Sequence, residues 1–268
     1  MPAFETELYP SGATPPSVTI SDLGRIEAGD AVTLSTGETI ELPATLEATM
    51  AAVLLPADRE RVAAQLPPNL SPIRAGCGKA PVWLLSVAYN DVGGGAIEPY
   101  DEFAVVLGAT PGPASGVPYL SPLVRTEGYV WYMPVTHESA RAFGDEIWAF
   151  PKVVGDVDVR EADGWRETTV AVDGERVVSL AMKRPPTISR TDSITAYTAT
   201  EAGTFGVAFE FSGRMGAWPY SGQFSCTLGD HPKADELRTF GLGDRAYLRF
   251  FATGEFTIYP GRRVADRS

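Results

Sequence analysis

Short runs of apolar residues, separated by turn-forming residues, recur along most of the chain and predict β-strands. Dense apolar runs at 81–89 and 103–107 are typical of buried strands. Residues 168–172 and 176–182 flank Asp173-Gly174, which favours a tight hairpin because glycine tolerates positive φ. Further strands are predicted at 31–34, 39–42, 246–251 and 255–259, the last two joined at Thr253-Gly254.

Helical patterns are few. Residues 56–66 contain strong helix formers and are followed by Pro67-Pro68, which would end the helix. Thr136 is expected to cap a second helix over 137–143, with Gly144 ending it. The pattern therefore predicts an α+β chain that is mainly antiparallel β.

Composition places the chain among globular proteins. Of its 268 residues, 44% are hydrophobic and 21% charged, so the low hydrophobicity that disorder requires is missing. With no internal repeat, we expect one domain over 1–268, in which 1–43 form an N-terminal extension. The formal charge of −12 argues against nucleic-acid partners and against binding to anionic membrane surfaces.

The basic residues and the cysteines indicate the kind of cell environment that the protein occupies. Only four basic residues are lysines, and the other eighteen are arginines, which suits either a high-salt cytoplasm or a GC-rich genome. Cys77 and Cys226 lie far apart, and the N-terminus lacks the pattern of a secretory signal. We therefore expect two reduced thiols in a soluble, cytoplasmic protein.

The most unusual local feature is a lysine inside an apolar and aromatic run. Lys152 follows Ile147-Trp148-Ala149-Phe150-Pro151 and precedes Val153-Val154. Apolar surroundings penalise the charged ammonium and favour the neutral amine, which is the form that attacks a carbonyl. The alternative is a lysine whose stem packs on a strand while its ammonium reaches water.

Two segments resemble the acetoacetate decarboxylase-like superfamily. Residues 138–152, ending in Phe150-Pro151-Lys152, are similar to the family's lysine motif. The strand-loop-strand from Tyr89-Asn90-Asp91-Val92 to Tyr100-Asp101-Glu102-Phe103 is similar to the one that carries a catalytic glutamate. With weaker matches, the resemblance extends from about residue 44 to 263.

The resemblance implies a β-barrel or cone with a few peripheral helices, and covalent amine catalysis. Lys152 would form a Schiff base with a small keto acid, and Glu102 would relay protons or position the substrate. Acetoacetate decarboxylase is a known example of a lysine made nucleophilic by its surroundings. Tyr89, Tyr100, Trp148 and Phe150 are expected to line the substrate pocket. No metal or organic cofactor is required, and a homo-oligomer is expected.

Departures from the family pattern leave the exact reaction open. The position after the nucleophile, often a second lysine in the family, is Val153, and the arginine of the motif is replaced by Asp145. The family's upstream arginine and glutamate fall near Ala48 and Leu85. Decarboxylation of a β-keto acid is the first hypothesis. An aldolase-dehydratase using the same lysine, and a catalytically silent barrel that binds a small ligand, are the alternatives.

Other candidate sites are weaker. His137 and His231 are the only histidines, which excludes a histidine-rich metal site. His137 is expected at a helix start or at the pocket mouth. Residues 241–246 mimic part of a dinucleotide fingerprint, but they lead into a strand and are expected to form a turn.

Overall fold

In a computed structural model of the protein, residues 25–113 and 127–265 are described. Strands dominate these two ranges, which contain three α-helices: α1 (Arg59–Ala63), α3 (Glu138–Trp148) and α4 (Pro232–Thr239). Within the same ranges, no helix has the length and apolar character needed to cross a bilayer. The predicted fold class, mainly antiparallel β with a few helices, is confirmed.

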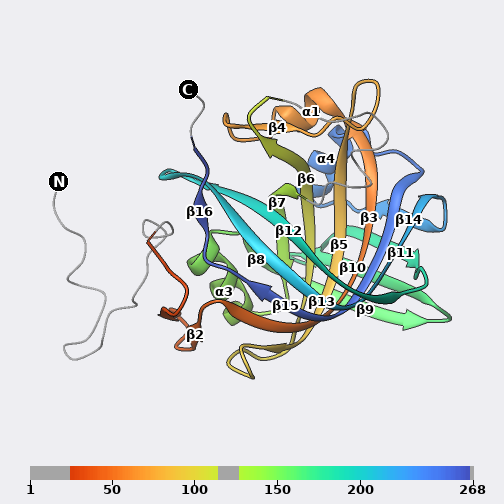
Figure 1. The fold of residues 1–268 in the computed structure, drawn as a ribbon. Coiled ribbons are helices and arrows are strands. Elements are labelled where there is room, and N and C mark those ends of the chain that lie inside the picture. The colour runs from red at the N-terminus through yellow and green to blue at the C-terminus, as the bar shows by residue number, and fades with distance from the viewer. Residues whose placement is uncertain (1–24, 114–126, 266–268) are drawn as a thin grey trace.

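Seven strands close a barrel (Figure 1). In order round the barrel they are β6 (Tyr100–Pro111), β5 (Lys79–Val92), β3 (Ala44–Asp58), β15 (Ala246–Ile258), β13 (Gly203–Ser221), β12 (Ile188–Thr200) and β7 (Glu127–Val135). Renewed pairing of β7 with β6 closes the circle. All neighbours run antiparallel except β12 and β7, which are parallel. The short strands β4 (Leu70–Pro72), β8 (Lys152–Val154) and β16 (Arg262–Arg263) add to β6, β7 and β13.

A second sheet packs on the outside of the barrel (Figure 1, right). Its four strands, in spatial order, are β14 (Phe224–Leu228), β11 (Glu175–Lys183), β10 (Trp165–Val172) and β9 (Asp156–Ala162). Side chains alternate between the two faces of a strand, so each barrel strand serves two cores. Val53 and Val105 point outward against Val170 of the second sheet, whereas Leu46 and Ala104 belong to the inner cluster.

The crossover β7–α3–β8 positions the lysine motif. β7 and β8 are parallel neighbours, with Met133 opposite Lys152, and α3 connects them. The buried face of α3 includes Ala140, Phe143 and Ile147, at the spacing of an amphipathic helix. These residues share the inner cluster with the barrel interior, so the helix closes over the space that contains Lys152.

The N-terminal hairpin covers the same helix. β1 (Ala31–Thr33) and β2 (Thr39–Glu41) pair as predicted. The backbone N–H of Ser35, in the turn between them, donates to Glu146 of α3 over 2.9 Å. This part of the expected extension therefore packs with the core around α3, while residues 1–24 lie outside the described residues.

Sheet pairing changes two predicted elements. The helix predicted at 56–66 is reduced to α1, because Pro56 and Ala57 continue β3 and pair with β5. The two strands predicted at 246–251 and 255–259 are one strand, β15, running through Gly254. A Cβ at Gly254 would collide with the backbone of β13, so this glycine permits a close strand approach rather than a turn.

The second predicted helix is longer than expected. His137, not Thr136, caps α3, because its Nδ1 accepts from the N–H of Ala140 over 3.2 Å. Gly144 lies inside the helix, which continues to Trp148. The turn that ends α3 is made by Ala149, in the left-handed region with a φ of 53°.

Candidate active site

The chain leaves α3 through a tight connection that delivers Lys152 to the first position of β8. Ala149 adopts positive φ, and the N–H of Phe150 donates to the carbonyl of Gly144 over 3.1 Å. Thr198 of β12 donates to the carbonyl of Ala149 over 2.5 Å. Pro151 then fixes φ directly before the lysine. The backbone that holds Lys152 is therefore anchored both to the helix and to the barrel wall.

Gly144 leaves room for the lysine side chain. A Cβ at this position would overlap Cε and Cδ of Lys152. The φ of Gly144 is helical, so space and not backbone freedom requires glycine here. Lys152 therefore runs across the face of α3 at the one point where the helix has no side chain.

The ammonium of Lys152 has three acceptors. Its Nζ lies 2.9 Å from Oε2 of Glu102, 3.1 Å from the carbonyl of Ala140 and 3.3 Å from the hydroxyl of Tyr100. The side chains of Lys152 and Glu102 are only 3% and 5% exposed. The three N–H donors of the ammonium are thus matched by three oxygens in an environment largely closed to water.

Two tyrosines complete the polar part of the site. Tyr89 donates from its hydroxyl to Oε1 of Glu102 over 3.4 Å, and its ring lies 4.6 Å from that of Tyr100. Burial raises the pKa of Tyr89 well above its usual range, and the charge of Glu102 adds to this. Burial also raises the pKa of Tyr100, with Tyr89 and Glu102 contributing. Both hydroxyls therefore stay protonated and able to donate over the whole neutral range.

Aromatic and aliphatic side chains enclose the rest of the cavity. Its lining residues come from five barrel strands, α3 and the segment that follows it: Tyr89, Tyr100, Glu102, Met133, Phe143, Gly144, Trp148, Phe150, Lys152, Phe209 and Ile258. Lys152 and Glu102 are the only charged residues among them. Phe150 stacks between Trp148 and Phe209, at centroid distances of 6.2 and 6.3 Å.

The enclosed volume is about 40 Å³, room for a few water molecules at most. A cleft of about 390 Å³ lies elsewhere, on the outer face of the barrel, and is far larger. Size alone would favour that cleft, but chemistry favours the small cavity. Among the described residues, only the Lys152–Glu102 ion pair has both side chains almost completely buried.

All six residues predicted for the site are brought together: Lys152, Glu102, Tyr89, Tyr100, Trp148 and Phe150. The sequence did not indicate Phe143, Met133, Phe209 or Ile258 as lining residues. Phe143 had a usable signal, because it lies on the same helical face as Ala140 and Ile147. Phe209 and Ile258 come from β13 and β15, whose pairing with each other had no signal in the sequence.

The positions that correspond to the missing family charges are apolar in the structure. Ala48 of β3 pairs with Tyr89, and Leu85 packs with the inner clusters. Neighbouring interior positions on β3, β13 and β15 are also apolar, including Met50, Phe211 and Phe256. This part of the barrel therefore offers no charged partner to a ligand.

The two histidines serve as helix caps. His231 accepts at Nδ1 from the N–H of Lys233 over 3.0 Å, at the start of α4. His137 caps α3, and its ring packs edge-on against Tyr100 at 5.7 Å, next to the cavity. In the described ranges, no group of three or more His, Cys, Asp or Glu side chains is placed to hold a metal ion.

Comparison with known proteins identifies the family. The family model for acetoacetate decarboxylase (ADC) matches residues 32–237. The chain belongs to the acetoacetate decarboxylase family. A comparison with curated protein sequences gave no match.

Solved structures of family members have the same fold. The enduracididine biosynthesis enzyme MppR, complexed with pyruvate, is 14% identical, with a TM-score of 0.61 over 84% of this chain and 91% of that chain. An acetoacetate decarboxylase is 14% identical, with a TM-score of 0.60 over 88% and 92%. The acetoacetate decarboxylase of Legionella pneumophila is 17% identical, with a TM-score of 0.57 over 84% and 88%. These structures include enzymes of the family. At identities this low, the likeness shows that the chain has the same fold and does not show which reaction it catalyses.

Proposed function

We propose that the protein is a carbon–carbon lyase that forms an imine between Lys152 and a small keto acid and then releases CO₂. One observation carries the proposal: the amine of Lys152 lies in an apolar cavity, 2.9 Å from the buried carboxylate of Glu102. A structural lysine has no need of such a position, because an ammonium is stabilised better in water.

The first step of the proposed reaction is proton transfer. The ammonium has no lone pair and cannot attack a carbonyl, so it must lose a proton. Glu102 is the nearest acceptor, and the transfer leaves a neutral amine beside a neutral carboxylic acid. Glu102 can then return this proton to the carbonyl oxygen, which takes its second proton from the amine nitrogen and leaves as water.

Decarboxylation follows from the electron demand of the iminium. The lone pair of the neutral amine forms the C–N bond, and the carbonyl oxygen departs as water. The bond between the α-carbon and the carboxylate breaks, its electron pair moves toward the iminium nitrogen, and CO₂ leaves an enamine. A proton adds to the α-carbon, and water hydrolyses the imine to release the ketone and Lys152. The site would need no separate electron sink.

The shape and polarity of the cavity favour keto acids with an apolar substituent. Beyond Glu102 the interior at Ala48, Leu85 and Phe211 carries no charge that could bind a second polar group. Glu102 would also repel the substrate carboxylate, which favours the loss of that charge as CO₂. Binding requires side chains to move, because about 40 Å³ is much less than the space that ligand sites generally enclose.

An aldol-type reaction is a second candidate. MppR, which has a similar fold, has been solved with the condensation product of pyruvate and imidazole 4-carboxaldehyde. For this reaction the pyruvate imine would lose a proton from its methyl carbon to the carboxylate of Glu102, in place of CO₂, and the resulting enamine would attack the aldehyde. The interior next to Tyr89 is apolar, and side chains would have to move to admit the aldehyde.

The test is a panel of β-keto acids of increasing chain length, each followed by proton NMR with wild type, Lys152→Met and Glu102→Gln. We expect at least one substrate to be converted to its ketone by wild type and not by Lys152→Met. Pyruvate with an aldehyde is included to detect condensation. If no compound reacts faster with wild type than in buffer, the protein is a ligand-binding barrel and not a lyase.

A further inference from the structure

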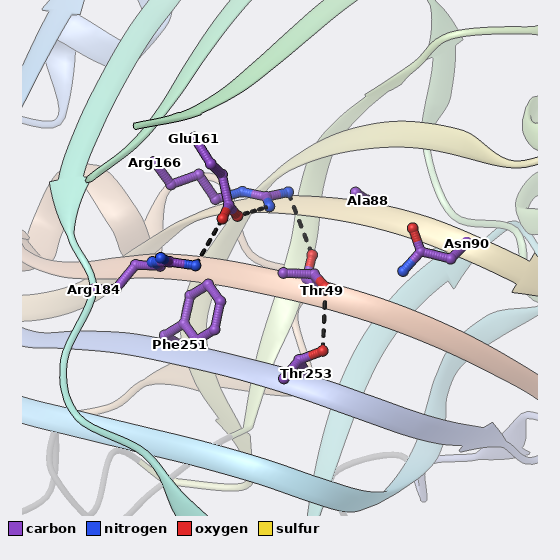
Figure 2. Close-up of a pocket in the computed structure, with 8 residues that line it drawn as sticks. All are labelled: Thr49, Ala88, Asn90, Glu161, Arg166, Arg184, Phe251 and Thr253. Atoms are coloured by element: carbon purple, nitrogen blue, oxygen red, sulfur yellow. Dashed lines mark hydrogen bonds and ion pairs between the residues drawn. The ribbon is translucent and has the colours of Figure 1, made fainter. Parts of the chain in front are cut away.

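The cleft of about 390 Å³ lies between the barrel and the outer sheet (Figure 2). Its volume is within the range of small-molecule sites. The lining residues come from β3, β5 and β15 on the barrel side and from β9, β10 and the residue after β11 on the other side: Thr49, Ala88, Asn90, Glu161, Arg166, Arg184, Phe251 and Thr253.

Two arginines converge in this cleft on one carboxylate. Arg166 donates from Nη1 to Oε1 of Glu161 over 2.7 Å, and Arg184 donates from Nη1 to Oε2 over 2.7 Å. Figure 2 shows both guanidiniums directed at Glu161 from different sides. The side chain of Arg166 is only 3% exposed, although it is charged. Burying a guanidinium is unfavourable unless hydrogen bonds compensate it, so this arrangement is a built feature of the cleft.

Among the described residues, several N–H donors of the two guanidiniums have no hydrogen-bond partner in the cleft. A guanidinium has five N–H donors. Arg166 uses three of them, for Glu161, the hydroxyl of Ser86 and the carbonyl of Thr49, which leaves two. Arg184 uses one, which leaves four, and its guanidinium lies 5.3 Å from the centre of the Phe251 ring. A ligand rich in acceptor atoms would complement this surface.

The balance of charge limits which acceptor-rich ligand fits. Two arginines and one glutamate give the lining a net charge of +1. Asp101 pairs with Ala88 on the same face of the sheet and interacts electrostatically with Arg166. Burial raises the pKa of Asp101, as does Asp158, while Arg166 lowers it. With Asp101 counted, two arginines face two carboxylates, so the cleft suits a ligand with at most a single negative charge and not the double charge of a phosphate.

We propose that this cleft binds a small monocarboxylate. Its two oxygens accept from the uncommitted N–H groups of Arg184 and Arg166, a geometry that suits a planar carboxylate. Its apolar part rests against Phe251 and Ala88. Asn90 and Thr253 are placed to bind a further polar substituent.

This site is separate from the Lys152 cavity. Ala88 faces the cleft, whereas the next residue on β5, Tyr89, faces the cavity. One thickness of sheet therefore divides the two, and a carboxylate bound to Arg184 does not reach Nζ of Lys152. The proposal does not depend on imine formation.

A titration of the whole protein with 4-fluorobenzoate, observed by ¹⁹F NMR, tests the proposal. This probe has no ketone and cannot form an imine. We expect saturable binding to wild type and an affinity at least about tenfold lower for Arg184→Met, a loss of about 1.4 kcal/mol. Arg190→Met is the matched control, because Arg190 is an exposed arginine paired with Asp192 away from the cleft.

Glu161→Gln tests the sign of the ligand charge. It removes the competing carboxylate and leaves the cleft more positive, so the monocarboxylate should bind more tightly. Weaker binding to Glu161→Gln would overturn the proposal, because it would make Glu161 an acceptor for the ligand. The absence of saturation below about 10 mM in wild type, or equal affinity for Arg184→Met, would also overturn it.

Discussion

Nζ of Lys152 and Oε2 of Glu102 lie 2.9 Å apart, although the two residues come from strands that are not neighbours. Glu102 is opposite Val135 of β7, and Lys152 is opposite Met133 of the same strand. β7 thus sets the distance between acid and amine. A buried ion pair of this kind adds little stability compared with apolar packing, so its presence is better explained by chemistry.

A double-mutant cycle should show that the two charges depend on each other. Glu102→Leu leaves a buried ammonium without its partner and should lower the free energy of unfolding by about 3–5 kcal/mol. Adding Lys152→Met should recover part of this loss, because no uncompensated charge remains. Urea denaturation of the four proteins at neutral pH measures the coupling. Additive effects, with a coupling below about 0.5 kcal/mol, would contradict the paired arrangement.

Gly144→Ala should separate activity from folding. The added Cβ overlaps the flexible end of Lys152, which can move aside, so the stability loss should be small. The displaced amine should react at least about 100-fold more slowly with a carbonyl, since about 1 Å of misplacement costs that much. Gly222→Ala is the control, because nothing lies within 4 Å of a Cβ there. An unchanged reaction rate in Gly144→Ala would mean that the position of Lys152 is not fixed by α3.

Phe209→Ala should broaden the range of substrates. Phe209 is half-buried on β13 and lines the Lys152 cavity. Removal of its ring enlarges the cavity, so kcat/KM for long keto acids should rise relative to short ones. One extra methylene in an apolar pocket is worth about 1–3 kcal/mol, which sets the expected scale.

Phe250→Ala provides the comparison, because Phe250 is also half-buried in the barrel but is not a lining residue of the cavity. It should leave the chain-length preference as in wild type. The same change of preference in both variants would show that general loosening of the barrel, and not the lining of the cavity, sets substrate length.

Local sequence marked Lys152 as unusual, because a single cation in an apolar run is rare whatever the fold, but its role as a nucleophile came from the family resemblance. Local sequence did not indicate Glu102. Its distance from Lys152 depends on the strand order in the barrel, which has no local signal, and only the family resemblance indicated the pairing. Neither the local sequence nor the family resemblance indicated Phe209 and Ile258 as lining residues. Their place at the cavity follows from the closure of the barrel.

Two of the errors in the fold prediction have a common cause. The sequence favours Gly144 and Gly254 as ends of elements, since glycine often ends a helix or forms a turn. In the structure both glycines lie inside elements, where they make room for Lys152 and for the backbone of β13. A single sequence does not show whether a glycine is needed for a turn or for close contact with a distant segment.

The two cysteines should differ in reactivity. Cys77 is exposed, whereas burial raises the pKa of Cys226 to about 11. Because the thiolate is the reactive form, only about 10⁻³ of Cys226 should be ionised at pH 8. Iodoacetamide at that pH should therefore modify Cys77 in the folded protein and leave Cys226 free until denaturant is added. Peptide mass spectrometry of wild type and Cys77→Ser checks this. Rapid labelling of Cys226 in the native protein would contradict the packing of β14 on β11.

Borohydride trapping tests the central claim most directly. The protein is incubated with keto acids, reduced, digested and analysed by peptide mass spectrometry, with Lys152→Ala as the control. Lys79, Lys183 and Lys233 are the only other lysines in the chain, so the modified site is assigned without ambiguity. We predict a reduced adduct on Lys152 in wild type and none in Lys152→Ala. A folded wild-type protein that forms no adduct with any keto acid, or forms it equally in Lys152→Ala, would contradict amine catalysis at this site.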